Sequence, residues 1–147
     1  MNDVIREAYN SNEPVFKIGA LFAMGKTYDE EWSGIVQHEL NSPDAEMRYE
    51  AARAAGEIGI EDAVPKLSRM VHEPDRDIQE VSIWALGEIG GKEATRVLQR
   101  LLDDPAYAID EGLVEALEDA LVTSTLPGDE LALWEMTEDD DLTDDLT

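Results

Sequence analysis

The residues best suited to metal binding or acid–base chemistry are two histidines, each followed by a glutamate. These pairs are His38-Glu39 and His72-Glu73. A two-metal centre needs ligands that converge on one point, but the pairs are 34 residues apart in a sequence whose repeat, described below, is 31 residues long. They therefore occupy different positions of their repeats. Because the chain also has no cysteine, we expect no metal centre, no bound cofactor and no catalytic activity.

The basic residues form a second set with recognisable chemistry, since arginine holds carboxylate and phosphate oxygens with two hydrogen bonds. The chain has 11 Lys and Arg against 35 Asp and Glu, yet residues 63–72 and 94–102 contain no acid at all. Steps of 31 residues from Glu7 reach one histidine and two arginines of this set. We call the following six candidate partner-binding residues the basic strip: His38, Lys66, Arg69, Arg96, Gln99 and Arg100.

A repeat of 31 residues positions these side chains. The motif GEIG occurs at residues 56–59 and again at 87–90, and apolar or small residues keep the same register over four units. Such self-similarity is the signature of stacked helical repeats. The aligned columns include Ala23, Ala54, Ala85 and Ala116; Phe16, Met47, Ile78 and Ile109; Ile5, Val36, Leu67 and Leu98; and Tyr9, Leu40, Val71 and Leu102.

Each unit is predicted to contain two helices, as residues 75–104 illustrate. Asp75 follows Pro74 and is a candidate N-cap. Apolar residues at helical spacing then continue to Gly90 and Gly91, where glycine permits the left-handed conformation that ends a helix. The inner faces are predicted to contain Ile78, Ser82, Ala85, Leu86 and Ile89 in the first helix, and Ala94, Leu98, Leu101 and Leu102 in the second.

Two stretches of the chain resemble a known family. The segments RYEAARAAGEIGIEDAVPKL and VSIWALGEIGGKEATRVL are similar to the short HEAT-like repeats of bilin-lyase subunits and of many small bacterial and archaeal adaptors. The resemblance implies a curved stack whose first helices lie on the convex side and whose second helices line a concave, partner-binding side. Deoxyhypusine hydroxylase, a HEAT-like enzyme, holds iron with His-Glu pairs, but the matching positions here are Tyr49-Glu50 and Glu80-Val81, which lack an imidazole.

We therefore predict an all-α fold, a right-handed α-solenoid of about four two-helix HEAT-like repeats. Residues 1–136 are expected to form the repeat domain, with a short final helix at residues 129–136. Residues 137–147 contain six acids and no base and are predicted to be a disordered tail. The predicted segments are a capping helix at 1–10 and repeats at 13–42, 44–73, 75–104 and 106–136.

The acidic composition limits the partners. A net charge of −24 repels nucleic acid and disfavours an anionic membrane surface. The sequence has neither a run of 18 apolar residues nor a basic and then apolar leader, so a cytoplasmic protein is expected. Many carboxylates with only four lysines are also typical of a salt-loving host, and this possibility stays open.

These observations predict a non-catalytic scaffold or adaptor, a monomer or weak homo-oligomer. Its partner would be a protein, or an acidic or phosphorylated peptide, bound on the concave face by the basic strip. Two alternatives remain for the strip itself: its bases pair with carboxylates such as Glu73 or Asp104, or the acidic tail occupies it when no partner is present. The alternative function is that of a bilin lyase or chromophore-chaperone subunit, although Trp32, Trp84 and Trp134 occupy unrelated positions.

Overall fold

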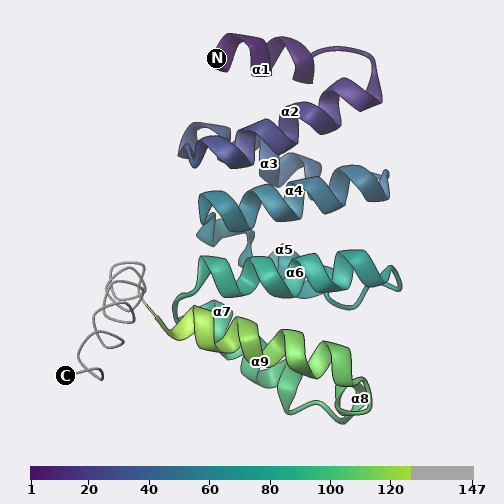
Figure 1. The fold of residues 1–147 in the computed structure, drawn as a ribbon, viewed down its shortest axis with the longest axis vertical. Helices are drawn as coiled ribbons and strands as arrows, with labels where there is room; N and C mark the ends of the chain where they lie inside the picture. The colour runs from purple at the N-terminus through teal and green to yellow at the C-terminus, as the bar shows by residue number, and fades with distance from the viewer. Residues whose placement is uncertain (127–147) are drawn as a thin grey trace, which may run out of the picture.

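The computed structural model describes residues 1–126, in which the helices stack in two layers (Figure 1). In the front layer, α2, α4, α6 and α9 each pack against the next. Behind them lie α3, α5 and α7, which we call the back layer, and α1 packs on α2 at the N-terminal end. The helix bounds are α1 Asn2–Tyr9, α2 Pro14–Thr27, α3 Ser33–Glu39, α4 Ala45–Ile58, α5 Val64–Met70, α6 Arg76–Ile89, α7 Gly91–Leu102, α8 Pro105–Ala108 and α9 Glu111–Thr125, with short 3-10 turns at Glu30–Trp32 and Glu61–Ala63.

No strand occurs within residues 1–126, and the all-helical solenoid predicted from the repeats is confirmed. None of the helices in this part of the chain is long and apolar enough to cross a membrane. The predicted final helix at residues 129–136 and the predicted disordered tail at residues 137–147 lie outside the described residues.

Capping interactions explain where the front-layer helices begin and end. The Asp75 carboxylate accepts a hydrogen bond from the backbone N–H of Asp77 at 2.9 Å, and Asp110 accepts one from the N–H of Leu113 at 3.1 Å. These contacts satisfy N–H groups that have no partner within their own helix. At the other end, Gly90 terminates α6 with φ +64°, a conformation that favours glycine. The N-cap predicted for Asp75 is therefore confirmed, and α6 ends at Gly90 as predicted. With ψ −164°, however, Gly90 is not in the predicted left-handed helical conformation, and Gly91 already begins α7.

The first glycine of each GEIG motif lets adjacent front-layer helices touch. A Cβ added to Gly56 would lie 2.9 Å from the Cα of Ala85, and one added to Gly87 would lie 2.9 Å from the Cα of Ala120. Real Cβ atoms do not approach other atoms so closely, so only glycine permits this spacing. The tight stack encloses a core whose fully buried side chains include Leu21, Met24, Trp32, Leu40, Leu67, Met70, Ile78, Ile83, Leu86, Leu98 and Leu117.

The fourth front-layer helix departs from the 31-residue period. Ile109 was expected to align with Ile78, but Ile109 is 88% exposed whereas Ile78 is 1% exposed. The buried position is taken by Leu113, at 4% exposure, four residues later. The prediction of Ile109 as a core residue is therefore wrong. Phe16, from the same predicted column, lies near the start of α2 and is also largely outside the core, with an exposure of 54%.

A local capping signal causes this shift. Pro105 begins the short helix α8, and Asp110 then caps a separate helix, α9. As a result Ala120, not Ala116, packs against Gly87. A shift of four residues is about one helical turn, so the same face of α9 still meets α6.

Candidate partner-binding surface

The basic strip spans three helices of the back layer. His38 lies on α3, Lys66 and Arg69 lie on α5, and the other three residues lie on α7. Lys66 is partly buried, and the remaining five side chains are exposed. The structure brings three of the six together along one groove, while the other three do not line it. The three that line the groove are Arg96, Gln99 and Arg100.

The carboxylates considered as partners of the strip are bound to other groups. Glu73 forms an ion pair with Arg48 at 2.9 Å. Asp104 caps α8 by accepting a hydrogen bond from the backbone N–H of Ala106 at 3.0 Å. Within residues 1–126, no lysine or arginine of the strip forms an ion pair with any carboxylate. In the described residues these bases therefore form no ion pair with Glu73 or Asp104.

The groove has a volume of about 1060 Å³ and lies between α7 and the end of α9. Three bases line it from one face of α7, because Lys92, Arg96 and Arg100 are spaced four residues apart. Two carboxylates, Glu88 and Asp103, also line it. Among the described residues that line the groove, bases therefore outnumber acids, in a chain whose overall composition is the reverse. Such a surface suits an anionic ligand.

Two contacts fix the walls of this groove. The hydroxyl of Thr95 on α7 donates a hydrogen bond to the Oγ of Ser124 on α9 at 3.0 Å, and Ser124 is only 4% exposed. At the α6–α7 turn, a Cβ on Gly90 would lie 3.1 Å from the carbonyl oxygen of Ser124. The turn and α9 are thus held at a distance that glycine allows, and the groove exists before any ligand arrives.

The sequence pattern missed two residues of the groove, Lys92 and Thr95. Glu61 and Glu30 occupy the positions equivalent to Lys92 in the two preceding repeats, so the alignment of repeats does not indicate a basic row there. The spacing of Lys92, four residues before Arg96, was the signal that would have identified it. Neighbours on one helix predict this site better than equivalents in other repeats.

The histidines do not form a metal centre in the described part of the chain. His38 is exposed, and the Nδ1 atom of His72 lies 2.5 Å from the hydroxyl of Tyr107. Burial, followed by the charge of Asp104, raises the pKa of the Tyr107 hydroxyl above its ordinary value. Within residues 1–126, no three His, Asp or Glu side chains lie together in a way that would hold a metal ion.

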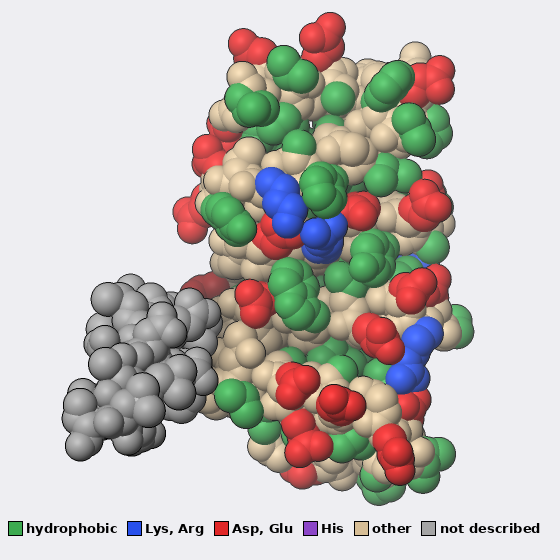
Figure 2. Space-filling model, in the orientation of Figure 1, with side chains coloured by type: hydrophobic (Ala, Val, Ile, Leu, Met, Phe, Trp, Pro, Cys, Tyr) green, Lys and Arg blue, Asp and Glu red, His purple; other side chains and the backbone are tan. Residues whose placement is uncertain are grey.

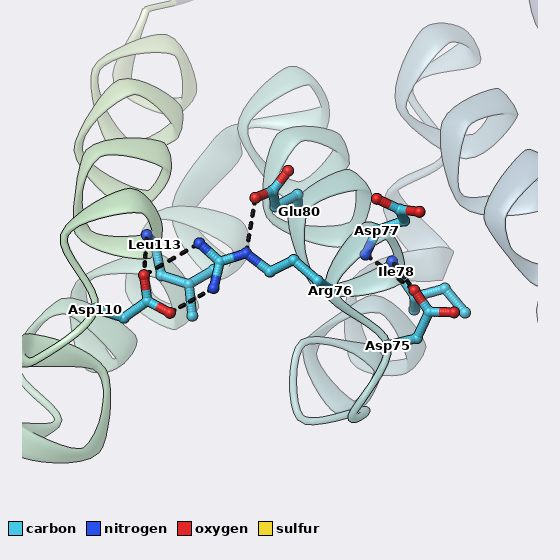
Figure 3. Close-up of polar contacts among 7 residues, drawn as sticks. All are labelled: Asp75, Arg76, Asp77, Ile78, Glu80, Asp110 and Leu113. Atoms are coloured by element: carbon cyan, nitrogen blue, oxygen red, sulfur yellow. Dashed lines mark hydrogen bonds and ion pairs between the residues drawn. The ribbon is translucent and has the colours of Figure 1, made fainter.

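Arg76 of α6 shows how a neutralised arginine is bound in this protein (Figure 3). Its Nε donates to Glu80 at 2.8 Å, and its Nη2 donates to Asp110 at 3.1 Å, while Nη1 donates to the other oxygen of Asp110. Gly112 leaves space for the guanidinium, since a Cβ there would lie 2.7 Å from Nη2. These hydrogen bonds lower the pKa of Asp110 below its ordinary value. Arg76 therefore fastens the start of α9 to α6.

One family of known proteins matches this chain. The family described as HEAT repeats matches residues 2–82 and residues 33–118, which together cover most of both layers. No curated protein matches the sequence. The matched residues include the first two helices of the basic strip and all of α7.

Proposed function

Because the chain belongs to the HEAT-repeat family, whose repeats generally form protein-interaction scaffolds, we propose that it is a non-catalytic adaptor that binds a partner protein. The partner contributes an anionic segment, rich in carboxylates or carrying phosphate, to the basic strip and the groove beside α7. One observation carries this proposal: the strip's lysine and arginines have no carboxylate partner within residues 1–126, in a chain of net charge −24.

The physical argument rests on the range of electrostatic forces. At physiological salt the screening length is about 8 Å, so the strip's own charges dominate the potential close to α7. Arginine binds a carboxylate or phosphate through two parallel hydrogen bonds, and Arg96 and Arg100 line the same groove. An anionic segment would therefore be bound locally despite the acidity of the whole chain. In this proposal the back layer forms the concave side of the stack.

The test is charge reversal at the two arginines of the 31-residue column, Arg69→Glu with Arg100→Glu. The probes are a labelled oligoglutamate peptide and a phosphoserine peptide of equal length, with binding measured by fluorescence anisotropy. We expect the double variant to lose about tenfold or more in affinity, as is typical when like charges replace a charge pair. Arg6→Glu with Lys17→Glu adds the same charge at the opposite end of the stack and serves as the control, with only a small change expected.

Binding of either peptide supports the proposal, and the peptide that binds identifies the anionic group that the strip recognises. Binding of the phosphopeptide alone indicates a phosphorylated partner, and equal binding of both indicates that carboxylates suffice. If wild-type protein bound neither peptide, or if the folded double variant bound as tightly as wild type, the strip would not be the binding surface. Circular dichroism shows whether each variant is folded.

No feature of the described part of the groove favours the alternative function, which is the binding of a bilin. A tetrapyrrole is best held between aromatic side chains, and none of the described residues that line the groove is aromatic. Absorbance in the visible range after co-expression with bilin would nevertheless reveal such a complex directly.

A further inference from the structure

A second surface, of opposite charge, lies on the front layer. Phe22, Arg53 and Trp84 recur at 31-residue intervals on α2, α4 and α6. The four-residue shift of α9 makes Asp119 the next member of this row, and Asp119 lines a groove together with Trp84. Figure 2 shows this face: basic side chains lie over α2 and α4, whereas acidic side chains gather over α9.

The first two members of the row already bind each other. The guanidinium carbon of Arg53 lies 4.7 Å from the centre of the Phe22 ring, and the Nζ of Lys26 lies 5.3 Å from it. Both bases also form ion pairs with Glu57, at 3.1 Å from Arg53 and 3.4 Å from Lys26. Both cations that lie over the Phe22 ring therefore belong to this chain.

Trp84 differs in this respect from Phe22, Trp32 and Tyr9. Arg6 lies 4.8 Å from the Trp32 ring, and Lys17 lies 5.4 Å from the Tyr9 ring. In the part of the chain that the structure describes, no lysine or arginine lies over Trp84, although its side chain is 41% exposed. An exposed indole is the best natural surface for a cation, and here the chain leaves it unused.

Of the residues in the described part of the chain, carboxylates and no base line the groove between Trp84 and α9. It has a volume of about 260 Å³, and Glu80, Glu88 and Asp119 line it. Glu80 is bound to Arg76, but neither Glu88 nor Asp119 forms an ion pair within residues 1–126. Desolvation raises the pKa of Glu88 above its ordinary value. A cation beside Glu88 would reverse that penalty.

One edge of the Trp84 ring packs against Gly56 of α4. A Cβ on Gly56 would lie 2.8 Å from the Cζ3 atom of Trp84, so the ring edge occupies space that only a glycine on α4 leaves open. The floor of the groove is made of small residues, Gly87, Ala116 and Ala120. A ring held against α4 at one edge loses less side-chain entropy when a ligand binds than a ring without such a contact.

We propose that the groove beside Trp84 binds an arginine side chain from a basic segment of a second protein partner. The guanidinium stacks on the indole face, and its N–H groups donate to Glu88 and Asp119. Arginine suits this site because its planar group both stacks on aromatic rings and binds carboxylates in pairs. None of the six residues of the basic strip lines this groove, although Glu88 lines both this groove and the groove beside α7. The adaptor would join an anionic segment on the back layer to a cationic segment on the front layer.

Charge selects this occupant over a second copy of the chain. Two copies each carry a net charge of −24 and repel one another. On the front layer, Arg48, Arg53 and Arg76 are already bound to Glu73, Glu57 and Asp110, so two front layers that met would offer each other no unpaired arginine. A copy that offered Arg69, Arg96 or Arg100 from its back layer would have to overcome the repulsion between the two net charges. A basic segment from another protein meets attraction at long range as well as at the site.

The test is NMR titration of the full chain with a short acetylated peptide that contains one arginine between glycine and leucine residues. Its twin has citrulline in place of arginine and has the same shape without the charge. We expect the arginine peptide to shift the indole N–H signal of Trp84. Trp84→Leu should weaken binding about two- to fivefold, the range of an exposed cation–π contact. Phe22→Leu is the matched control and should leave the affinity unchanged, since that ring is already occupied.

Two further variants keep the test decisive if Trp84→Leu disturbs folding. Trp84→Phe retains an aromatic face and should keep most of the affinity. Glu88→Gln with Asp119→Asn removes the carboxylates without altering the ring and should weaken binding by a similar factor. Equal binding of the citrulline twin, or unchanged affinity in the folded carboxylate variant, would overturn the proposal. Binding that depends only on added salt and is the same in every variant would show a non-specific response to net charge and would overturn it as well.

Discussion

The bases of the front layer and those of α7 are of the same types but stand in opposite situations. Lys26, Arg53 and Arg76 each form an ion pair with a carboxylate of the same layer. Arg96 and Arg100 on α7 have no such partner within residues 1–126. The difference is not the supply of acids, which outnumber bases three to one in the chain. It is the placement of the acids.

Lys26, Arg53 and Arg76 therefore belong to the fold, whereas Arg96 and Arg100 are available to a partner. Like charges four residues apart on a helix repel each other by a few tenths of a kcal/mol, and Lys92, Arg96 and Arg100 have this spacing. The chain carries this small destabilisation without any compensating contact in the described residues. Departures of this kind from local optimality are typical of functional surfaces.

The largest expected effect comes from breaking the support that both surfaces share. Gly87→Ala places a Cβ 2.9 Å from the Cα of Ala120 and 3.0 Å from its carbonyl oxygen. Because backbone cannot move aside cheaply, we expect the free energy of unfolding to fall by about 1–3 kcal/mol. Urea denaturation measures this change. Gly19→Ala is the control, since nothing lies within 4 Å of that position, and replacing a helical glycine should stabilise the chain by up to about 1 kcal/mol.

A result in which Gly87→Ala and Gly19→Ala had the same stability would contradict the close approach of α6 and α9. It would also contradict the four-residue shift, because the contact of Ala120 with Gly87, at the position where the period expects Ala116, is the evidence for that shift.

The next effect sharpens the contrast between the layers directly. Arg53→Ala should lower the free energy of unfolding by about 1 kcal/mol, because Glu57, whose side chain is 9% exposed, then keeps only its contact with Lys26. Arg100→Ala should change stability by less than about 0.5 kcal/mol, as is usual for an exposed side chain. Thermal unfolding of the two variants tests this difference. Equal losses would mean that Arg100 has a stabilising contact that its geometry does not show.

Much of the fold was predictable because three consecutive units keep the same period. The GEIG motif recurs since each first glycine touches the next front-layer helix, so the close packing left a direct mark in the sequence. The buried residues Ile78, Ala85, Leu86, Ala94 and Leu98 were predicted on the same basis and are buried.

The fourth unit was predicted wrongly because helical periodicity does not distinguish registers one turn apart. Apolar residues at spacing four satisfy both alignments, so Leu113 and Ile109 were equally suitable for the core. The decisive feature was Asp110, whose carboxylate starts a new helix after α8. One local cap thus overrode a pattern shared by three units.

The candidate site was predictable in part. Its helices follow from the 31-residue columns, but the partners of each base do not, because they depend on the angle at which a side chain leaves its helix. Glu73 seemed close to the strip in sequence, yet it binds Arg48 of α4. Long-range ion pairs of this kind become visible only when the helices are packed.

A smaller effect concerns the pH dependence of stability. The pKa of Glu88 is raised in the folded chain by desolvation, so its contribution to stability is fully present below the ordinary glutamate pKa of about 4.3 and is lost as pH rises through the folded value. At neutral pH the ionised carboxylate is therefore a net penalty. Glu88→Gln should raise the melting temperature slightly at pH 7, and this gain should vanish below about pH 4. A gain that persisted in acid would show that charge is not its cause.

The smallest expected effect is that of removing residues 137–147, which lie outside the described residues. The segment contains six acids and no base, and Leu142 and Leu146 are its only large apolar side chains. It therefore has little surface to bury in return for the entropy of being ordered. We expect the melting temperature to change by less than about 2 °C, measured by calorimetry at about 0.15 M salt, where exposed charges are screened.

The same truncated chain shows whether the basic strip is always open to a partner or is occupied by the acidic segment when no partner is present. If the acidic segment occupies the strip, truncation should raise the affinity for the oligoglutamate peptide, and Arg69→Glu with Arg100→Glu should abolish that gain. If affinity is the same with and without the segment, the strip is open to partners at all times. A melting temperature lowered by many degrees would instead show that the segment is part of the fold.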